Sequence, residues 1–321
     1  MAPHDAAAMN AIFKAYDIRG TVPDQLDAAL MERIGAAFAR FAADSSGASS
    51  VLIAHDMRPS GPDFAEAFAR GATGQGIDVV HLGLASTDLL FFAAGHFDMP
   101  GAMLTASHNP AQYNGVKLCL AGAKPIGAET GLTEIRDMTV AGLESVDVAG
   151  TVSSRDDALG VFVTHVHSFV DPAVLRPLRV VADTANGMGG LTAPAVFAGL
   201  PFELDVIFGE LDGTFPNHPA DPIQPENLRD LQARVLETSA DVGLAFDGDA
   251  DRVFLVDDEG ELVSGSLTTA IVADSMLAKH PGEIVLHNLI CSKAVPEIIV
   301  ERGGTPVRTR VGHSYIKQVM A

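Results

Sequence analysis

Cysteine is scarce in this sequence, which has only Cys119 and Cys291 among its 321 residues. Neither lies at the spacing of a metal site, and two isolated cysteines do not indicate the disulfide framework of a small secreted protein. Both lie in or beside apolar, strand-like segments. We therefore expect two buried thiols and no disulfide.

Positive charge is also scarce. Lys and Arg number 21 against 41 Asp and Glu, so the formal net charge is −20. A chain of this charge repels nucleic acid and anionic membranes, and we expect it to bind neither. An anionic ligand would need a local cluster of cations or a metal ion to receive it.

Long hydrophobic runs are absent. The sequence has no stretch of about 18 apolar residues, and its first residues lack the unbroken apolar core of a signal peptide. Hydrophobic residues make up 47% of the chain and charged residues 19%, which is the composition of a soluble globular protein. We therefore predict a cytoplasmic location.

What the sequence does contain is a regular alternation of short apolar runs with amphipathic stretches. In the first part, strand-like runs lie at 51–54, 78–83 and 101–105, with helix-like stretches at 63–72 and 88–95. This alternation is typical of βαβ units and predicts an α/β fold. The pattern resumes after a polar patch at 151–157 and again after a hairpin-like segment at 252–265.

We therefore predict consecutive α/β domains at residues 1–152, 153–256 and 257–321. The last of them is incomplete in this prediction. Its final segment, HSYIKQVMA, offers barely two helical turns and has no glycine or proline stop. We expect the chain to be a fragment or a naturally truncated product.

Three aspartates alternate in the segment AFDGDADRV. Asp247, Asp249 and Asp251 follow an apolar strand directly, and carboxylates this close raise one another's pKa unless a cation neutralises them. A set of oxygen ligands suits Mg²⁺, Mn²⁺ or Ca²⁺. An EF-hand is excluded, because its glycine position falls on Arg252 and its flanks are strand-like. A phosphatase with an aspartyl nucleophile and a solvated acidic turn remain as alternatives.

A serine follows another apolar strand in the segment LTASHNPAQYNGVKL. Ser107 precedes His108, Asn109 and Pro110. Open α/β sheets bind ligands at the carboxyl ends of their strands, so this hydroxyl could be a nucleophile or could carry a phosphate. A turn in which Ser107 and Asn109 bond nearby backbone explains the segment equally well. A Ser-His hydrolase is disfavoured, because no G-x-S-x-G motif occurs.

Other polar segments indicate little when each is taken alone. FKAYDIRG places Tyr16 and Arg19 on either side of Asp17. A basic residue and a tyrosine could bind a phosphate here, but an Arg19–Asp17 pair in an irregular surface segment is the favoured explanation. RTRVGHSYIK groups basic side chains, His313 among them, around a glycine that opens a helix. An anion site at the helix N-terminus and a capped helix with solvated charges explain this segment about equally well. DTANGMGG, residues 183–190, lacks the spacing of a dinucleotide fold and predicts a tight turn.

Taken together, these segments resemble a known family. FKAYDIRG, TASHNP, NGVK, DTANG, GTFPNHPADP, DGDADRV and VGHSYIK occur in the order found in the α-D-phosphohexomutases, and FKAYDIRG is similar to the phosphomannomutase/phosphoglucomutase branch. The resemblance covers residues 12–317. It implies four α/β domains with mixed sheets around a central cleft, of which this chain holds a phosphoserine-bearing, a metal-binding and an incomplete sugar-binding domain. The fourth domain would be missing.

The resemblance also implies roles for single residues. Ser107 would carry a phosphate, with Lys117 and Arg19 beside the transferred group. Mg²⁺ would be held by Asp247, Asp249, Asp251 and the phosphate on Ser107. The residues implied to line the substrate cleft are Tyr16, His108, Asn109, Arg252 and His313.

The implied activity is the reversible interconversion of hexose 1-phosphate and hexose 6-phosphate, with mannose or glucose as the sugar. It would proceed through the phosphoserine and a hexose 1,6-bisphosphate, which would also serve as activator. The expected partner is a small phosphosugar, and the sequence leaves the oligomeric state open, with a monomer as the simplest case. The alternative is a truncated, non-catalytic fragment that binds a metal or a sugar phosphate.

Overall fold

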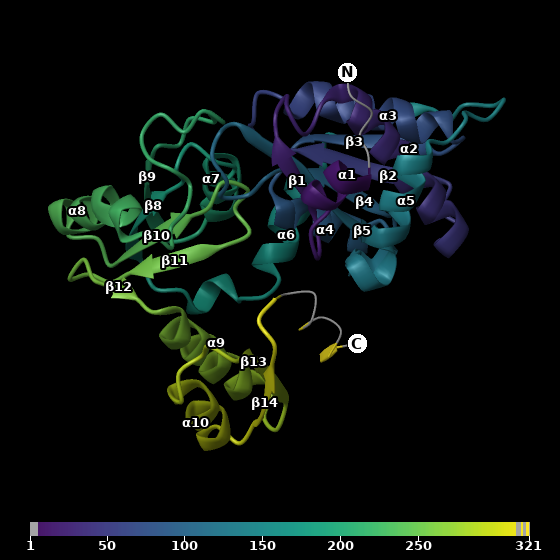
Figure 1. Cartoon of the computed structure of the whole chain (residues 1–321). Coiled ribbons are helices and arrows are strands. Elements are labelled where there is room, and N and C mark those ends of the chain that lie inside the picture. The colour runs from purple at the N-terminus through teal and green to yellow at the C-terminus, as the bar shows by residue number, and fades with distance from the viewer. Residues whose placement is uncertain (1–5, 313–315, 317–318, 321) are drawn as a thin grey trace.

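The computed structural model describes residues 6–312, 316 and 319–320 of the chain. These residues form three α/β units in sequence order, each with its own sheet. The first two units lie side by side and the third lies below them (Figure 1). The two larger sheets contain both parallel and antiparallel pairs, as the prediction of mixed sheets requires.

The first unit contains a sheet of seven strands in the order β1-β5-β4-β2-β3-β7, with β6 paired to β5. Its strands are β1 (Ile18–Thr21), β2 (Ser50–His55), β3 (Asp78–Leu84), β4 (Gly101–Leu104), β5 (Tyr113–Leu120), β6 (Lys124–Pro125) and β7 (Val152–Ser154). Its helices are α1 (Ala6–Ile12), α2 (Ala28–Ser46), α3 (Gly61–Gly74), α4 (Thr87–His96) and α5 (Thr133–Ala141).

Strand β2 shows why this sheet is covered on both faces. Successive side chains of a strand point to opposite faces, and the run VLIA offers an apolar side chain to each. Val51 and Ile53 pack into one hydrophobic core, while Leu52 and Ala54 pack into the other. Helices therefore have an apolar surface to cover on either side of the sheet.

The polar patch at 151–157 was predicted to connect two units, but part of it forms a strand. Residues 152–154 form β7, which pairs in parallel with β3 at the edge of the first sheet. All three residues of β7 are exposed, so no apolar alternation marked them as a strand. The domain ranges 1–152, 153–256 and 257–321 stay predictions.

The second unit begins with α6 (Ala158–His167) and contains a five-stranded sheet in the order β12-β11-β10-β8-β9. β8 pairs in parallel with β9 and β10, and β11 and β12 form the predicted hairpin. The remaining elements are β8 (Leu178–Asp183), α7 (Gly189–Phe197), β9 (Phe202–Ile207), α8 (Arg229–Thr238), β10 (Val242–Phe246), β11 (Val253–Val256) and β12 (Leu262–Val263).

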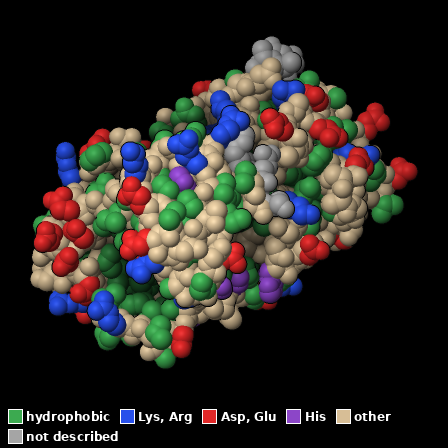
Figure 2. Space-filling view, turned by 90° about the horizontal axis from the view of Figure 1, so that it is seen from below, with side chains coloured by type: hydrophobic (Ala, Val, Ile, Leu, Met, Phe, Trp, Pro, Cys, Tyr) green, Lys and Arg blue, Asp and Glu red, His purple; other side chains and the backbone are tan. Residues whose placement is uncertain are grey.

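The third unit consists of α9 (Gly265–Lys279), β13 (Ile284–Asn288), α10 (Ala294–Glu301) and β14 (Thr305–Thr309). Two strands and two helices bury few side chains, and the core holds Ala270, Ala273, Leu277, Val295 and Ile299. Many of its large apolar side chains are exposed, and hydrophobic side chains are spread over the face that includes this unit (Figure 2). The helix predicted to start at His313 begins outside the described residues.

Two further expectations concern cysteine and membranes. Cys119 is fully buried in β5, as expected, but Cys291 is only half-buried after β13, and neither forms a disulfide. In the described part of the chain, no helix combines the length and apolar character needed to cross a bilayer. The cytoplasmic location stays a prediction.

A histidine pairs with a buried aspartate at the carboxyl end of β8. The Nε2 atom of His218 lies 3.0 Å from Oδ2 of Asp183, and its Nδ1 atom lies 2.9 Å from the carbonyl oxygen of Pro219. Both ring nitrogens therefore face acceptors, which favours the doubly protonated ring. Burial alone would lower the pKa of His218, but the hydrogen bond and charge of Asp183 outweigh it and raise this pKa above 6.5.

This raised pKa predicts a pH-dependent contribution to stability. The contribution is fully present below pH 6.5, the ordinary pKa of histidine, and is lost as pH rises through the folded pKa. We expect His218→Gln to lower the free energy of unfolding by about 1–2 kcal/mol at pH 5.5 and by less at pH 8.5. Denaturant unfolding of both proteins at the two pH values measures this. A loss that grows with pH would contradict the protonated pair.

Candidate active site

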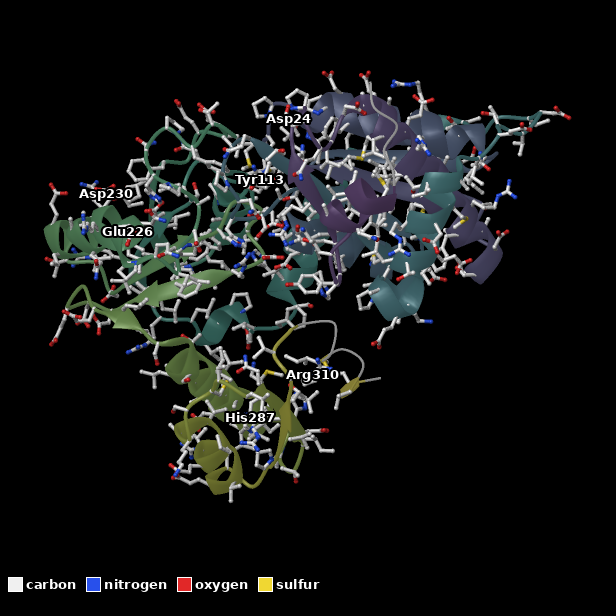
Figure 3. The ribbon with its side chains drawn as sticks, in the orientation of Figure 1. Asp24, Tyr113, Glu226, Asp230, His287 and Arg310 are labelled. Carbon is white, nitrogen blue, oxygen red and sulfur yellow. The ribbon has the colours of Figure 1, made fainter. Side chains whose placement is uncertain are left out.

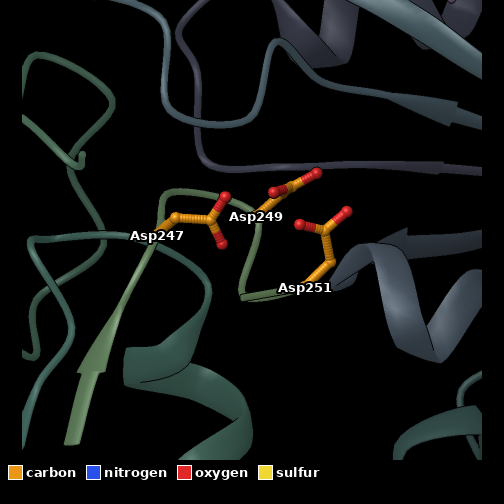
Figure 4. Close-up of side chains that lie close together, drawn as sticks. All are labelled: Asp247, Asp249 and Asp251. Atoms are coloured by element: carbon orange, nitrogen blue, oxygen red, sulfur yellow. The ribbon is translucent and has the colours of Figure 1, made fainter. Parts of the chain in front are cut away.

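The three aspartates lie on the loop that follows β10. Each of Asp247, Asp249 and Asp251 offers one carboxylate oxygen, and these oxygens lie within 4.8 Å of one another (Figure 4). Asp247 and Asp249 are fully buried, while Asp251 is half-buried. A solvated acidic turn, one of the two alternatives, is therefore wrong, because two of its three acids have no contact with solvent.

Cationic side chains hold these carboxylates. The Lys117 ammonium lies 2.6 Å from Oδ2 of Asp249 and 2.6 Å from Oδ2 of Asp251, and Nε of Arg252 lies 3.0 Å from Oδ2 of Asp247. Burial and the neighbouring carboxylates raise the pKa of Asp247 to about 8. Burial also opposes ionisation of Asp249, but the charge of Lys117 outweighs it and lowers the pKa of Asp249 to about 2.

The cluster fits a divalent cation by its own geometry. The Oδ1 atom of Asp249 is buried and has no hydrogen-bond partner, although its Oδ2 atom accepts from two donors. A buried carboxylate oxygen without a partner is costly unless a cation or donor reaches it. A cluster that offers only oxygen ligands suits Mg²⁺ and similar hard cations. The residues present therefore fit such an ion.

Helix α4 of the first unit holds this loop from the other side. At its N-terminus, the Thr87 hydroxyl donates to Oδ2 of Asp249 at 2.5 Å, and the Thr87 backbone N–H donates to the carbonyl of Asp249 at 3.0 Å. Gly248 approaches the first unit so closely that an added Cβ would lie 2.5 Å from the carbonyl oxygen of Ser107. The carboxylate loop is thus fixed directly against the serine loop.

Thr87 therefore sets the orientation of Asp249, and its hydroxyl can be tested by itself. Thr87→Val keeps the shape of the side chain but leaves Oδ2 of Asp249 without one of its donors. We expect this change to lower the free energy of unfolding by about 1–3 kcal/mol, because the acceptor is buried. Thr87→Ser keeps the donor and should lose clearly less. Denaturant unfolding compares the two, and equal losses would contradict a role for the hydroxyl.

Ser107 lies three residues after β4, in the loop that leads to β5. Its backbone has a φ of 52°, in the left-handed region that non-glycine residues rarely adopt. The side chain is buried, and its Oγ atom donates to Oδ2 of Asp247 at 2.8 Å. Nη2 of Arg252 donates to the same Oγ at 2.6 Å. The hydroxyl therefore lies between a carboxylate of the cluster and a guanidinium.

A cavity of about 310 Å³ opens beside Ser107. Arg19 reaches it from β1 and donates to Oδ1 of Asn109 at 2.5 Å and to Asp17 at 2.8 Å. Burial, and then the charge of Arg252, lower the pKa of His108. The residues that line the cavity are Tyr16, Asp17, Arg19, Ser107, His108, Lys117, Asp251 and Arg252.

The structure thus brings most of the residues singled out from the sequence into one place, at the facing carboxyl ends of β4 and β10. His313 lies outside the described residues. Sequence reasoning missed Thr87, because STDLL shows only the start of a helix. It also missed Asp56 and Arg58, a buried ion pair whose arginine donates to the carbonyl of Ser107. Their segment, DMRPSG, has the composition of an ordinary surface turn.

Comparison with known proteins places this site in context. Family models described as phosphoglucomutase/phosphomannomutase, alpha/beta/alpha domains I, II and III, match residues 10–144, 161–260 and 264–321. The phosphohexose mutases of Xanthomonas campestris pv. campestris are 39% identical over 311 residues, which are 96% of this chain and 68% of that protein. The phosphomannomutase of Salmonella montevideo is 35% identical, again over 96% of this chain and 68% of the relative.

A solved structure of a family member has a similar fold. The crystal structure of a phosphoglucomutase/phosphomannomutase family protein from Burkholderia thailandensis superposes with a TM-score of 0.89 at 34% sequence identity. The match covers 97% of this chain and 68% of that protein. The three described units are therefore similar in arrangement to the corresponding part of a larger relative.

Proposed function

Because this chain belongs to the phosphoglucomutase/phosphomannomutase family, of the isomerase class, we propose that it interconverts hexose 1-phosphate and hexose 6-phosphate by way of a phosphate on Ser107. The sugar is mannose or glucose, the two that the family name covers. A hexose 1,6-bisphosphate is the intermediate, and it also charges the serine as activator.

One observation carries this proposal. The Ser107 hydroxyl lies within 2.8 Å of a buried carboxylate and within 2.6 Å of the Arg252 guanidinium, at the edge of a cavity lined by cations. Phosphoryl transfer needs positioned charge more than covalent work by other side chains. A hydroxyl in such a place is suited to exchanging a phosphoryl group with a ligand in the cavity.

The transfer proceeds in two matching halves. In the first, the bond between phosphorus and Ser107 Oγ breaks, a bond to a free hydroxyl oxygen of the hexose monophosphate forms, and the proton of that hydroxyl replaces the phosphoryl group on Oγ. In the second, the bisphosphate has turned round in the cavity. Its other phosphoryl group moves to Oγ, and the sugar oxygen takes the proton back.

Cationic side chains of the chain would neutralise the negative charge of the phosphoryl group during transfer. Arg252 lies against Ser107 Oγ and neutralises the group that leaves it, while Arg19 lines the same cavity and donates to Asn109. Lys117 lies between Asp249 and Asp251 and supplies further positive charge. His108 and Tyr16 contribute polar atoms to the lining, where we propose that they contact the sugar.

A divalent cation completes the site. Asp247, Asp249 and Asp251 would hold Mg²⁺ together with an oxygen of the phosphate on Ser107, and the ion would supply stabilisation of the negative charge that moves during transfer. Asp249 Oδ1 is the oxygen best suited to this ligation, because it is the buried one without a partner.

A coupled assay tests the proposed function. The 321-residue chain is supplied with Mg²⁺, a hexose 1,6-bisphosphate, and mannose 1-phosphate or glucose 1-phosphate, and formation of the 6-phosphate is followed. Turnover that requires both Mg²⁺ and the bisphosphate is the expected result. Binding of the phosphosugar without any turnover would favour the alternative of a non-catalytic fragment.

A further inference from the structure

Arg58 is a fully buried arginine whose every N–H group is used. It follows β2 in the first unit, and its exposed fraction is 1%. Its Nε atom donates to Oδ2 of Asp56 at 3.2 Å, and its two terminal nitrogens donate to four backbone carbonyls. These carbonyls belong to Ser107 (2.8 Å), Asn109 (2.7 Å), Pro110 (2.9 Å) and Tyr113 (2.8 Å).

All four carbonyls lie on the serine loop, defined here as residues 105–113. Tyr113, labelled in Figure 3, is where this loop enters β5. One rigid planar guanidinium therefore fixes the loop at its serine, at its middle and at its end. A lysine ammonium has three donors on a flexible stem and cannot make the same set of bonds.

The ion pair of Arg58 with Asp56 is expected to add little to the free energy of unfolding. Both side chains are fully buried, and removing two charges from water offsets most of what their attraction contributes. The backbone N–H of Arg58 also donates to Asp56, which fixes the pair in one orientation. Such a pair is better explained by the geometry it imposes on the loop than by a gain in stability.

That geometry includes the strained backbone of Ser107. A non-glycine residue at a φ of 52° persists only where its surroundings hold it. Arg58 binds the carbonyl of Ser107 itself and that of Asn109, two residues later. The Ser107 N–H donates to the hydroxyl oxygen of Thr105 at 2.9 Å, so the serine is held on both sides.

Arg58 also touches the second unit. The guanidinium carbon lies over the ring of Phe215, 5.2 Å from its centroid, and Gly213 comes so close that an added Cβ would lie 2.5 Å from the Arg58 Cα. The same residue thus contacts the serine loop and the second unit, which carries the aspartates.

We propose that Arg58, oriented by Asp56, is the positioning residue of the serine loop and fixes the place from which Ser107 Oγ exchanges its phosphoryl group. Arg58 touches no reacting atom and acts only through the backbone carbonyls of the loop. The catalytic part of the proposal rests on the proposed function, whereas the ordering of the loop does not.

The test compares Arg58→Lys and Arg58→Met with the unaltered chain. Phe38→Leu, a core change on α2 that is remote from the serine loop, controls for a general loss of stability. Two properties are measured well below each variant's unfolding temperature. The first is hydrogen exchange of peptides covering 105–116, and the second is the rate at which a hexose 1,6-bisphosphate phosphorylates Ser107, with kcat and KM where turnover occurs.

We expect both Arg58 variants to exchange hydrogen at least about tenfold faster in this loop than the unaltered chain, with β2 and β3 unchanged. Phosphorylation of Ser107, and kcat, should fall by about a hundredfold with little change in KM, because a small displacement of a reacting atom has this effect. Phe38→Leu should stay within about twofold of the unaltered chain in both respects.

A folded Arg58→Met variant with unaltered loop exchange would overturn the proposal, and so would unaltered phosphorylation. Faster exchange in the variants while the unaltered chain transfers no phosphate would instead locate the failure in the proposed function. If neither variant folds, hydrogen exchange of the unaltered chain tests the proposal instead. Residues 105–116 must then exchange as slowly as β4, and rapid exchange there would contradict an anchored loop.

Discussion

Ser107→Ala is expected to lose phosphoryl transfer by about 10⁴-fold or more, the scale on which removal of an enzyme's nucleophile acts. The change deletes the one oxygen that the site offers as phosphate carrier, and it removes the hydroxyl that links Asp247 to Arg252. Among the residues that line the described cavity, the other hydroxyl belongs to Tyr16, which is 39% exposed. The coupled assay with Mg²⁺ and bisphosphate measures the loss.

A matched control is Ser45→Ala, which removes the hydroxyl of an exposed residue on α2. Its activity should equal that of the unaltered chain. Mg²⁺ binding by Ser107→Ala, measured by calorimetry, should persist, because all three aspartates remain. Full activity in Ser107→Ala would exclude a mechanism through a phosphate on this serine.

Asp249→Asn is expected to weaken Mg²⁺ binding by about a hundredfold or more, and to lower turnover with it. The Oδ2 atom of Asp249 is already engaged by Thr87 and Lys117, so the carboxylate presents its unpartnered Oδ1 to an ion. An amide has only one oxygen. Either that oxygen stays with the two donors, or an NH₂ group is turned toward the Lys117 ammonium, and both arrangements harm the site.

Calorimetric titration with Mg²⁺ measures this effect without depending on activity. Asp258→Asn is the matched control, because it removes one negative charge from an exposed position seven residues beyond Asp251. Its Mg²⁺ affinity should change by less than about threefold, as expected for a screened surface charge. Equal affinities in Asp249→Asn and the unaltered chain would show that the aspartate loop does not hold the ion.

The sequence was informative where chemistry lies next to a strand. Asp247 follows β10 directly and Ser107 follows β4 closely, so strand ends alone pointed to both. Those patterns could not predict the hydrogen bond between Ser107 and Asp247, because 140 residues separate the two in sequence. The residues alone gave no signal for Lys117 and only a weak one for Arg19, so their roles rested on the resemblance to a family.

The residues that sequence reasoning missed act through tertiary contacts. Arg58 binds carbonyls about 50 residues away, and Thr87 binds a side chain 162 residues away. Neither stands beside a recognisable motif, because a backbone carbonyl or a helix start leaves no pattern in the sequence. β7 was missed for a different reason, since its three residues are exposed and its pairing comes from the edge of the sheet.

The central claim is that Ser107 accepts a phosphoryl group and passes it to a sugar. The most direct measurement is a single-turnover experiment in which the chain is mixed with labelled hexose 1,6-bisphosphate and analysed by mass spectrometry. Our account predicts one phosphate, stable to acid and hydroxylamine and mapped to Ser107, that moves to hexose 1-phosphate when the latter is added. A phosphate that maps to one of the aspartates, or one that remains on Ser107 after the sugar is added, would contradict the account.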